Sequence, residues 1–284
     1  MLRRDVPPAR LRDHARAVAD GFDELWIVED LPYAGGISQA AAVLEVTQGV
    51  GGGVGPVIGH GIAPAPFRNP AALAMEWATL AEMYPGRLAA GVGHGVQSWM
   101  AQINERVDSP LTLLDETIDV VQRLLAGECV SAEGRYVSLD NVELVFPPTV
   151  APLVSAGVMG PKSLELAGRT AGGTVLPEGR GPGDITAARA AIDCGRSVAG
   201  RTDPHRLTVF TGFYCGPLAE LGPPPPDAPP GWAAVAETPA ECATLLQTIV
   251  DAGADSVVLV PFGDDMEGQL RLAAADIVPL LVRG

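Results

Sequence analysis

Short apolar runs alternate along the chain with longer stretches in which apolar residues recur every three or four positions. The short runs predict seven strands, at 24–28, 54–60, 87–91, 153–156, 174–176, 207–213 and 256–260. The longer stretches predict eight helices, at 8–20, 37–47, 70–83, 111–126, 161–171, 183–199, 239–252 and 266–281. Strands that alternate with helices in this way are typical of βα units around a parallel sheet.

Eight helices and seven strands predict an α/β fold, a (β/α)8 TIM barrel whose first strand is truncated. Only seven residues precede the first predicted helix, and of these residues 1–4 are what remains for that strand, so most of it is absent from the sequence. A start site assigned too late would give the same pattern. A doubly wound open sheet is the alternative, because apolar strands covered on both faces fit either arrangement.

Two segments depart from the alternation. Residues 127–148 read as an excursion with a small hairpin, and the proline-rich residues 216–231 read as a stiff surface loop. The chain shows no internal repeat, and barrels of this kind commonly reach 284 residues as one domain. We therefore expect a single domain over residues 1–284.

Charge and cysteine content limit the classes of partner and the cellular compartment that we expect. Nineteen basic and thirty-four acidic residues give a net charge of −15, which disfavours nucleic acid or an anionic membrane as a partner. Residues 46–67 carry no charged side chain, but glycines and prolines interrupt them too often for a membrane helix. Four scattered cysteines and the lack of an apolar leader favour a cytoplasmic protein with reduced thiols and no structural zinc.

Active sites of such barrels lie at the carboxyl ends of the strands. The residues at these ends are Glu29 and Asp30, His60 to Ala63, Gly91 to Gly95, Gly157 to Lys162, and Pro177 to Gly179. Glycine recurs at four of the five ends. Either the backbone approaches a flat, bulky ligand there, or the loops simply turn sharply.

The junction after the predicted strand 153–156 suits an anion. Gly157 and Gly160 permit a tight turn, Pro161 begins a helix, and the only lysine of the chain, Lys162, precedes Ser163. Unpaired N–H groups and the helix dipole favour negative charge at such a place, so we expect a bound phosphate. An ordinary βα loop is the alternative.

The stretch H-G-I-A-P-A-P-F-R-N-P, which begins at His60, resembles the bacterial luciferase-like superfamily of oxidoreductases. The segments G-F-D-E-L-W-I-V-E-D, P-G-R-L-A-A-G-V-G-H-G and A-G-V-M-G-P-K-S-L-E-L-A-G extend the resemblance over nearly the whole chain. It is nearest to members that use coenzyme F420, including methylenetetrahydromethanopterin reductase-like proteins. The resemblance implies an F420-dependent enzyme, a homodimer, that transfers a hydride between the deazaflavin and a small organic substrate.

Three alternatives stay open. Within the family, the chain would be an FMN-dependent monooxygenase. Outside catalysis, it would be a barrel that binds a cofactor without turnover. A metal-free aldolase or isomerase barrel for a phosphorylated substrate requires a lysine or carboxylate inside the barrel, and Lys162 lies on the anion loop instead.

The resemblance assigns cofactor contacts to several loops. Gly61 and Ile62, followed by Ala63, fall where F420-using relatives have a non-proline cis peptide bond that presses against the middle ring of the cofactor. Gly91, Gly93 and His94 match the loop beside the ring system. His94 would transfer a proton or only hydrogen-bond the ring.

The remaining cofactor contacts are at the phosphate. The resemblance implies that Gly157, Gly160, Pro161, Lys162 and Ser163 bind it, and Glu178 is a further candidate for cofactor binding. Arg180 is either a second cation for the phosphate or a surface residue.

Glu29 and Asp30 are candidate catalytic acids. Relatives often have an acid followed by histidine at this strand end, so Asp30 is a departure that puts proton transfer here in doubt. The alternative is that the two acids cap a turn. Trp99 and Met100, with Gln97 and Gln102, either wall the substrate pocket or pack in the core.

Overall fold

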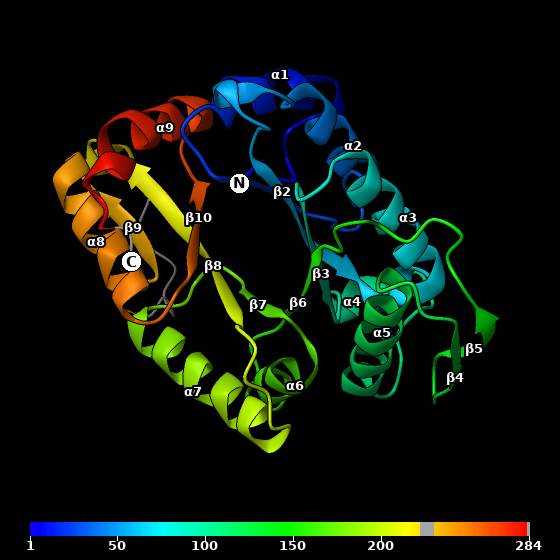
Figure 1. Cartoon of the computed structure of the whole chain (residues 1–284). Coiled ribbons are helices and arrows are strands. Elements are labelled where there is room, and N and C mark those ends of the chain that lie inside the picture. Colours follow the sequence, from blue (N-terminus) through cyan, green and yellow to red (C-terminus); the bar gives the residue numbers. More distant parts are fainter. Residues whose placement is uncertain (222–229, 283–284) are drawn as a thin grey trace.

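Seven parallel strands follow one another in the order β1-β2-β3-β6-β7-β8-β10, and helices surround them (Figure 1). A computed structural model describes residues 1–221 and 230–282. These seven strands are β1 (Glu24–Ile27), β2 (Val57–Pro64), β3 (Leu88–Gly93), β6 (Leu153–Gly157), β7 (Gly173–Leu176), β8 (Arg206–Cys215) and β10 (Ser256–Pro261). The α-helices are α1 (Pro8–Ala19), α2 (Gly36–Val46), α3 (Pro70–Met83), α4 (Gln97–Gln102), α5 (Pro110–Leu125), α6 (Pro161–Thr170), α7 (Pro182–Val198), α8 (Pro239–Asp251) and α9 (Met266–Leu272).

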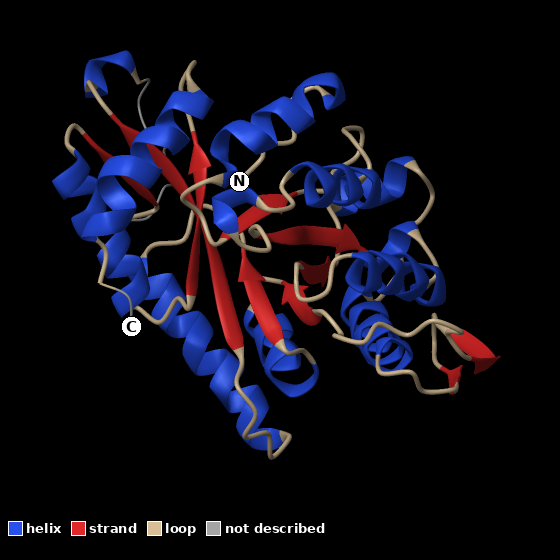
Figure 2. Ribbon diagram, turned by 45° about the horizontal axis from the view of Figure 1, so that its top comes forward, coloured by secondary structure: helices blue, strands red, loops and turns tan. Residues whose placement is uncertain are grey.

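Helices cover the outer faces of the strands (Figure 2), and an apolar cluster that includes Trp26, Phe210 and Val260 fills the barrel interior. All four residues of β7 and nine of the ten in β8 are buried. Strands covered on both faces read as continuous apolar runs, which is why the sequence reveals them without a period of two. The α/β prediction is confirmed.

The first two residues close the barrel. The Met1 amine donates a hydrogen bond to the Leu259 carbonyl of β10 at 2.6 Å, and the Leu2 amide donates to the Trp26 carbonyl of β1 at 2.8 Å. Below them, a cavity of about 350 Å³ remains between β1 and β10. No strand is assigned before α1 within the described residues. Met1 and Leu2 therefore bridge β10 and β1 where a first strand would lie, and the cavity remains where the rest of that strand would be.

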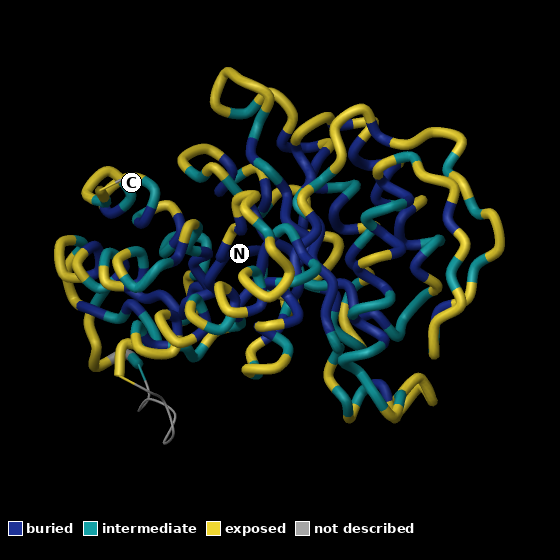
Figure 3. Tube along the Cα trace, turned by 60° about the horizontal axis from the view of Figure 1, so that its bottom comes forward, coloured by how far each residue is buried: buried dark blue, intermediate teal, exposed yellow. Residues whose placement is uncertain are grey.

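Two apolar clusters hold the elements together. The larger one lies between the strands and the helices and includes Trp77 of α3 and Ile118 of α5. The smaller one fills the barrel and contains Met1, Trp26 and Phe210. The rings of Trp26 and Phe210 pack edge to face, with their centres 5.5 Å apart. Figure 3 shows this arrangement as a buried centre under an exposed outer layer.

Helix α5 shows how the sequence specifies the outer layer. Its buried residues recur at helical spacing, and they are Leu113, Leu114, Thr117, Ile118, Val120, Val121, Leu124 and Leu125. The Ser109 side chain accepts a hydrogen bond from the Thr112 amide, and Pro110 occupies the first turn, where its missing N–H costs nothing. The apolar stripe faces the barrel, and the cap fixes where the helix begins.

The departures from the alternation are largely as expected. Residues 127–148 contain the antiparallel hairpin β4 (Val130–Glu133) and β5 (Ser138–Val142), which stands away from the barrel in Figure 1. The centre of the expected proline-rich loop, residues 222–229, lies outside the described residues. Among the helices of the described ranges, none is long and apolar enough to cross a membrane.

Some element predictions were wrong. Strand β2 begins three residues later than expected and runs on to Pro64. The last helix is interrupted, because a π-turn at Ala273–Ile277 and a 3-10 turn at Val278–Leu280 follow α9, and Pro279 cannot donate a helical hydrogen bond. Helix α4 and strand β9 (Ala233–Ala236), which pairs with β8, were not predicted.

Candidate active site

A cavity of about 690 Å³ opens at the carboxyl ends of the barrel strands. Its floor consists of apolar side chains from inside the barrel, which are Val28, Ile62, Val175, Phe210 and Val260. Small-molecule sites typically measure ~300–1,000 Å³ and have mostly apolar walls with a few polar groups. The volume and the apolar floor suit a flat ring system.

Eight of the predicted site residues line this cavity, and they are Asp30, Gly61, Ile62, His94, Gly157, Gly160, Ser163 and Glu178. Six do not line it, and they are Glu29, Ala63, Gly91, Gly93, Pro161 and Lys162. Trp99 lines the cavity, whereas Met100 is fully buried in the protein. Gln97 donates to the His94 and Gly95 carbonyls, and Gln102 is exposed.

Strand β2 carries a bulge that forms part of the cavity wall. The Gly61–Ile62 peptide bond is cis, and the pairing of β2 with β3 shifts register between His60 and Ala63. A Cβ atom on Gly61 would lie 2.6 Å from Trp26 Cε3. Glycine is required at this position because the Trp26 ring packs directly beneath the bulge.

Three glycines make room for the Ile62 side chain. A Cβ atom would lie 3.0 Å from Ile62 Cγ2 at Gly91, 2.9 Å from Ile62 Cδ1 at Gly93, and 2.4 Å from Ile62 Cγ2 at Gly157. The predicted cofactor contacts Gly91 and Gly93 also lie against backbone, because a Cβ atom would be 2.7 Å from the His60 carbonyl oxygen at Gly91 and 2.7 Å from the Gly157 carbonyl oxygen at Gly93. The three glycines thus allow Ile62 and the neighbouring backbone to pack closely against β3 and β6.

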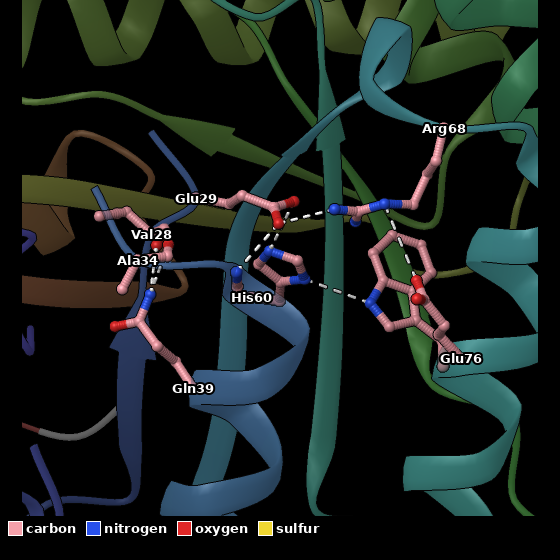
Figure 4. Close-up of polar contacts among 9 residues, drawn as sticks. Val28, Glu29, Ala34, Gln39, His60, Arg68 and Glu76 are labelled. Atoms are coloured by element: carbon pink, nitrogen blue, oxygen red, sulfur yellow. Dashed lines mark hydrogen bonds and ion pairs between the residues drawn. The ribbon is translucent and has the colours of Figure 1, made fainter. Parts of the chain in front are cut away.

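Glu29 belongs to a buried ionic cluster beside the cavity (Figure 4). Its side chain is 5% exposed, and Oε1 accepts hydrogen bonds from the Gly36 amide at 2.9 Å and from Arg68 Nη2 at 2.7 Å. Arg68 also lies near Glu76, with Nε 3.8 Å from Oε2. Of the two candidate acids, Asp30 lines the cavity and Glu29 does not, and the bond from the Gly36 amide to Glu29 agrees with the alternative that this acid caps a turn.

His60 completes this cluster as a neutral ring. Its Nδ1 accepts a hydrogen bond from Trp77 Nε1 at 3.3 Å, so the ring proton is on Nε2, which lies 3.6 Å from Glu29 Oε2. Burial lowers the pKa of His60 to about 4, although the nearby Glu29 charge acts in the opposite direction. A Cβ atom on Gly36 would lie 2.0 Å from His60 Nε2, so glycine is required there too.

The loop after β1 is held by the same group of contacts. Gln39 Nε2 donates to the Val28 carbonyl at 3.1 Å and to the Ala34 carbonyl at 3.0 Å (Figure 4). Together with the bond from the Gly36 amide to Glu29, these contacts fix both ends of the loop. Asp30, inside the loop, therefore has a defined place at the cavity.

Asp30 faces the cavity and pairs with an arginine near the chain start. Arg4 Nη1 donates to Asp30 Oδ2 at 2.8 Å. The Arg4 guanidinium also lies 5.0 Å from the centre of the Tyr33 ring and 5.9 Å from that of the Trp99 ring. The Arg4 side chain is 46% exposed, so this pair lies at the cavity mouth.

His94 bridges two loops of the site. Its Nδ1 donates to the Pro110 carbonyl at 3.2 Å, which leaves Nε2 to accept a hydrogen bond from Ser163 Oγ at 3.1 Å. Burial lowers the pKa of His94, so the ring is neutral near pH 7. Both ring nitrogens are occupied, and His94 positions Ser163 at the start of α6.

The α6 end of the cavity has the features of an anion site. Gly160 precedes the helix, Ser163 lines the cavity in its first turn, and the helix N-terminus carries no side-chain cap. Arg180 lies nearby, with Nη2 3.2 Å from the Met159 sulfur, a weak acceptor. Lys162 is exposed beside this end and does not line it. A phosphate therefore fits here through backbone N–H groups, Ser163 and Arg180.

Arg3 and Arg4 are cavity residues that the sequence analysis missed. They directly follow Met1 and Leu2, which occupy the place of the first strand. The rule that sites lie at strand ends would have identified both residues if it had been applied to this remnant. Phe210 and Val260 were also missed, because an inward-facing position within a strand has no separate signal in one sequence.

Known proteins resemble this chain over most of its length. The sequence profile of the family described as "Luciferase-like monooxygenase" matches residues 1–220. A 5,10-methylenetetrahydromethanopterin reductase of Methanolobus tindarius is 29% identical over 72% of this chain, and the match covers 60% of that enzyme. An F420-dependent glucose-6-phosphate dehydrogenase of Nakamurella multipartita is 28% identical over 96% of this chain and 93% of that enzyme.

Solved structures share the fold. An F420-dependent secondary alcohol dehydrogenase, solved with an F420-acetone adduct, superimposes with a TM-score of 0.83 at 19% identity and covers 98% of this chain and 96% of its own. This similarity confirms the predicted TIM barrel. The family profile extends from Met1 past the cis bulge, the His94 loop and the α6 anion site. The chain therefore belongs to the luciferase-like monooxygenase family.

Proposed function

We propose that the protein is an F420-dependent oxidoreductase that transfers a hydride between the deazaflavin and a small organic substrate. One observation carries the proposal. A single cavity joins an apolar floor with the Gly61–Ile62 bulge to an anion site at the start of α6. In support, one relative whose name specifies F420 matches 96% of this chain and 93% of its own sequence, and a solved F420-dependent enzyme shares the fold.

Bound in the cavity, the deazaflavin supplies a ring carbon that accepts or gives a hydride. The protein supplies its support and its surroundings. Ile62 is fixed in place by the glycines at positions 91, 93 and 157, so the bulge forms a rigid surface for one face of a ring. Val175, Phe210 and Val260 exclude water from the barrel side.

The start of α6 would bind the cofactor phosphate. Backbone N–H groups of the first turn and Ser163 Oγ would donate to it, and Arg180 would exchange its sulfur contact for an oxygen. His94 would hold the Ser163 hydroxyl in place through Nε2. We propose this positioning role for His94 in place of proton transfer, since both of its ring nitrogens already have partners.

Asp30 is the proposed proton acceptor. It faces the cavity, and only Oδ2 is bonded to Arg4, so Oδ1 is available to a substrate hydroxyl. The anionic carboxylate takes the hydroxyl proton when the alcohol carbon loses its hydride. The reverse direction returns the proton to the oxygen of the carbonyl.

A titration of the purified protein with coenzyme F420 and, separately, with FMN tests this function. Cofactor fluorescence reports binding, and absorbance of the deazaflavin reports a change of redox state when alcohols are added. We expect F420 to bind tightly and FMN weakly. Preferential FMN binding would favour the monooxygenase suggested by the name of the matched family. Tight binding without turnover of any alcohol or carbonyl compound would favour a non-catalytic barrel.

We further propose that the chain forms one domain and a homodimer in the cytoplasm. One continuous apolar cluster joins residues from α1 to the π-turn after α9, which supports a single domain.

The proposed dimer rests on an exposed apolar face. Met75 and Met83 of α3 are exposed, as expected for a face that another subunit covers. Light scattering at several protein concentrations tests the dimer, and a monomer at every concentration would contradict it.

A further inference from the structure

The guanidinium of Arg4 is fixed at the cavity mouth and has donors to spare. Nη1 donates to Asp30, and the guanidinium carbon lies 5.0 Å from the centre of the Tyr33 ring and 5.9 Å from that of the Trp99 ring. No acceptor contacts Nε or Nη2 within the described residues. These two atoms form the edge that binds a carboxylate in two parallel hydrogen bonds.

Arg3 makes a useful contrast with Arg4. Its Nε and Nη2 bond the Asp5 carboxylate at 3.1 and 2.9 Å, and its Nη1 bonds the Pro261 carbonyl at 3.2 Å. Every nitrogen of Arg3 is thus occupied by the protein itself. Of the two arginines in the cavity lining, Arg4 alone offers a free edge among the described residues.

Asp30 offers a second free group next to this edge. Oδ2 bonds Arg4 and Oδ1 has no partner in the described part of the chain. The cavity mouth thus presents a donor pair for a carboxylate and an acceptor for a hydroxyl on one ion pair. A hydroxyl and a carboxylate on adjacent carbons would fit these two groups together.

We propose that the substrate is a 2-hydroxy acid, or a 2-oxo acid in the reverse direction, whose carboxylate binds Arg4. This inference rests on the proposed function and names the substrate class of the same site. The C2–H bond breaks and its electron pair leaves with the hydrogen to the oxidised deazaflavin. The hydroxyl proton passes to Asp30 Oδ1, and the C2–O bond becomes a carbonyl. The 2-oxo acid, the reduced cofactor and the protonated Asp30 balance the reaction.

The charges around the mouth favour a monoanion. Glu178 is an exposed acid of the cavity lining, and Asp5 is neutralised by Arg3. With Arg4 shared between Asp30 and the substrate, a second negative group on the substrate would lie near Glu178, and the described cavity lining offers no further unpaired arginine or lysine to offset it. The rest of the lining is largely apolar and would accept the carbon chain of the acid.

Calorimetric titration with 2-hydroxyhexanoate, its methyl ester and 6-hydroxyhexanoate tests the proposal on the protein loaded with F420. We expect the 2-hydroxy acid to bind roughly 10- to 100-fold more tightly than the ester, which lacks the charge. The 6-hydroxy isomer keeps the charge but separates it from the hydroxyl, so it should bind more weakly than the 2-hydroxy acid. Equal affinity for acid and ester would overturn the proposal.

Substitutions locate the effect. Arg4→Met should abolish the preference for the acid over the ester and leave F420 affinity unchanged, and Arg4→Lys should restore part of the preference. As the control, Arg10→Gln removes one positive charge from the exposed face of α1. It should change neither the preference for the acid over the ester nor the affinity for F420. An Arg4→Met variant that still prefers the acid would refute the role of Arg4. Failure of both F420 and FMN to bind would refute the proposed function instead, and the acid titration of the unloaded protein would still decide the role of Arg4.

Discussion

The cavity has two walls that keep their shape by different means. On the β1–β2 side, buried charged groups meet: Glu29 bonds Arg68 and the Gly36 amide, and His60 lies against them as a neutral ring. On the β6–α6 side, the wall consists of backbone, with glycines at positions 157 and 160 and a helix start without a side-chain cap. The first wall is supported from behind by electrostatic pairing, and the second depends on the absence of side-chain atoms.

This difference has a physical reason. A wall that binds a flat ring needs a rigid shape. Buried ion pairs can hold the surrounding loop in one conformation, although removing the charged groups from water costs free energy. A wall that must hold a phosphate needs free N–H groups and close approach, which side chains would block. The two walls should therefore fail under different substitutions and different conditions.

Removal of the Glu29 carboxylate should have the largest effect. Glu29→Leu removes the carboxylate that accepts a 2.7 Å hydrogen bond from Arg68 Nη2. It also leaves the buried Gly36 amide without an acceptor. Breaking such a pair by removing one partner costs about 4 kcal/mol, which lowers Tm by roughly 10 °C in a chain of this size. Thermal unfolding followed by circular dichroism measures it.

The neighbouring acid is the matched control. Asp30→Asn alters a pair whose arginine is half exposed, so it should cost at most ~1 kcal/mol of stability. Turnover, not stability, should fall in this variant. If Asp30→Asn lowered Tm as much as Glu29→Leu, the two acids would not differ in the way that their burial indicates.

Acid should weaken the β1–β2 wall next. Burial lowers the pKa of His60 to about 4 in the folded chain, whereas the unfolded value is ~6.5. Between these values the unfolded chain binds a proton that the folded chain does not, so stability falls as the pH falls from about 6.5 to about 4. His60 alone would contribute on the order of 3 kcal/mol over this window.

Urea unfolding at a series of pH values measures this loss. His205, whose pKa is also lowered to about 4 by burial and neighbouring arginines, contributes in the same direction. His60→Gln should therefore flatten the pH dependence only in part, and the His60→Gln, His205→Gln double variant should flatten it further. A pH profile that His60→Gln left unchanged would contradict the assigned pKa.

The sequence predicted the barrel better than the walls of its site. Strands and helices have periodic signals, so β7 and β10 were found from their apolar residues alone, while the short alanine-rich β9 was missed because alanine has little preference for strands. The position of the cavity followed from the strand-end rule. These features depend on residues near each other in the chain.

The roles of individual site residues depend on contacts that one sequence does not contain. A glycine shows that a Cβ atom is absent, but not which atoms fill the space, and at Gly91 and Gly93 these are a backbone carbonyl oxygen and the side chain of Ile62. Glu29 and Asp30 are equivalent in the sequence, and only their contacts in the loop after β1, with Arg68 and the Gly36 amide for Glu29 and with Arg4 for Asp30, distinguish them. The sequence left His94 between proton transfer and hydrogen bonding alone, and its two partners, Pro110 and Ser163, are what support the positioning role that we propose.

A Cβ atom at Gly157 should damage both walls moderately. It would lie 2.4 Å from Ile62 Cγ2, a branched atom close to the backbone that cannot turn away. Gly157→Ala should therefore displace the bulge, destabilise the fold by about 2 kcal/mol and weaken F420 binding by roughly tenfold. Fluorescence titration measures the binding, and full retention of affinity would show that the contour of the bulge does not matter.

Substitutions at Gly160 should have the smallest and most selective effect. A Cβ atom there meets nothing within 4 Å, and the backbone angles of −81° and 147° suit any residue, so Gly160→Ala should leave stability and cofactor affinity unchanged. Gly160→Asp places a carboxylate beside the expected phosphate and should weaken F420 binding by roughly threefold to tenfold, more at low salt than at high salt. Gly160→Asn has nearly the same shape without the charge and should bind as Gly160→Ala does. Equal binding by the aspartate and asparagine variants would mean that no phosphate lies at this helix start, and the anionic end of the cofactor would have to be sought elsewhere in the cavity.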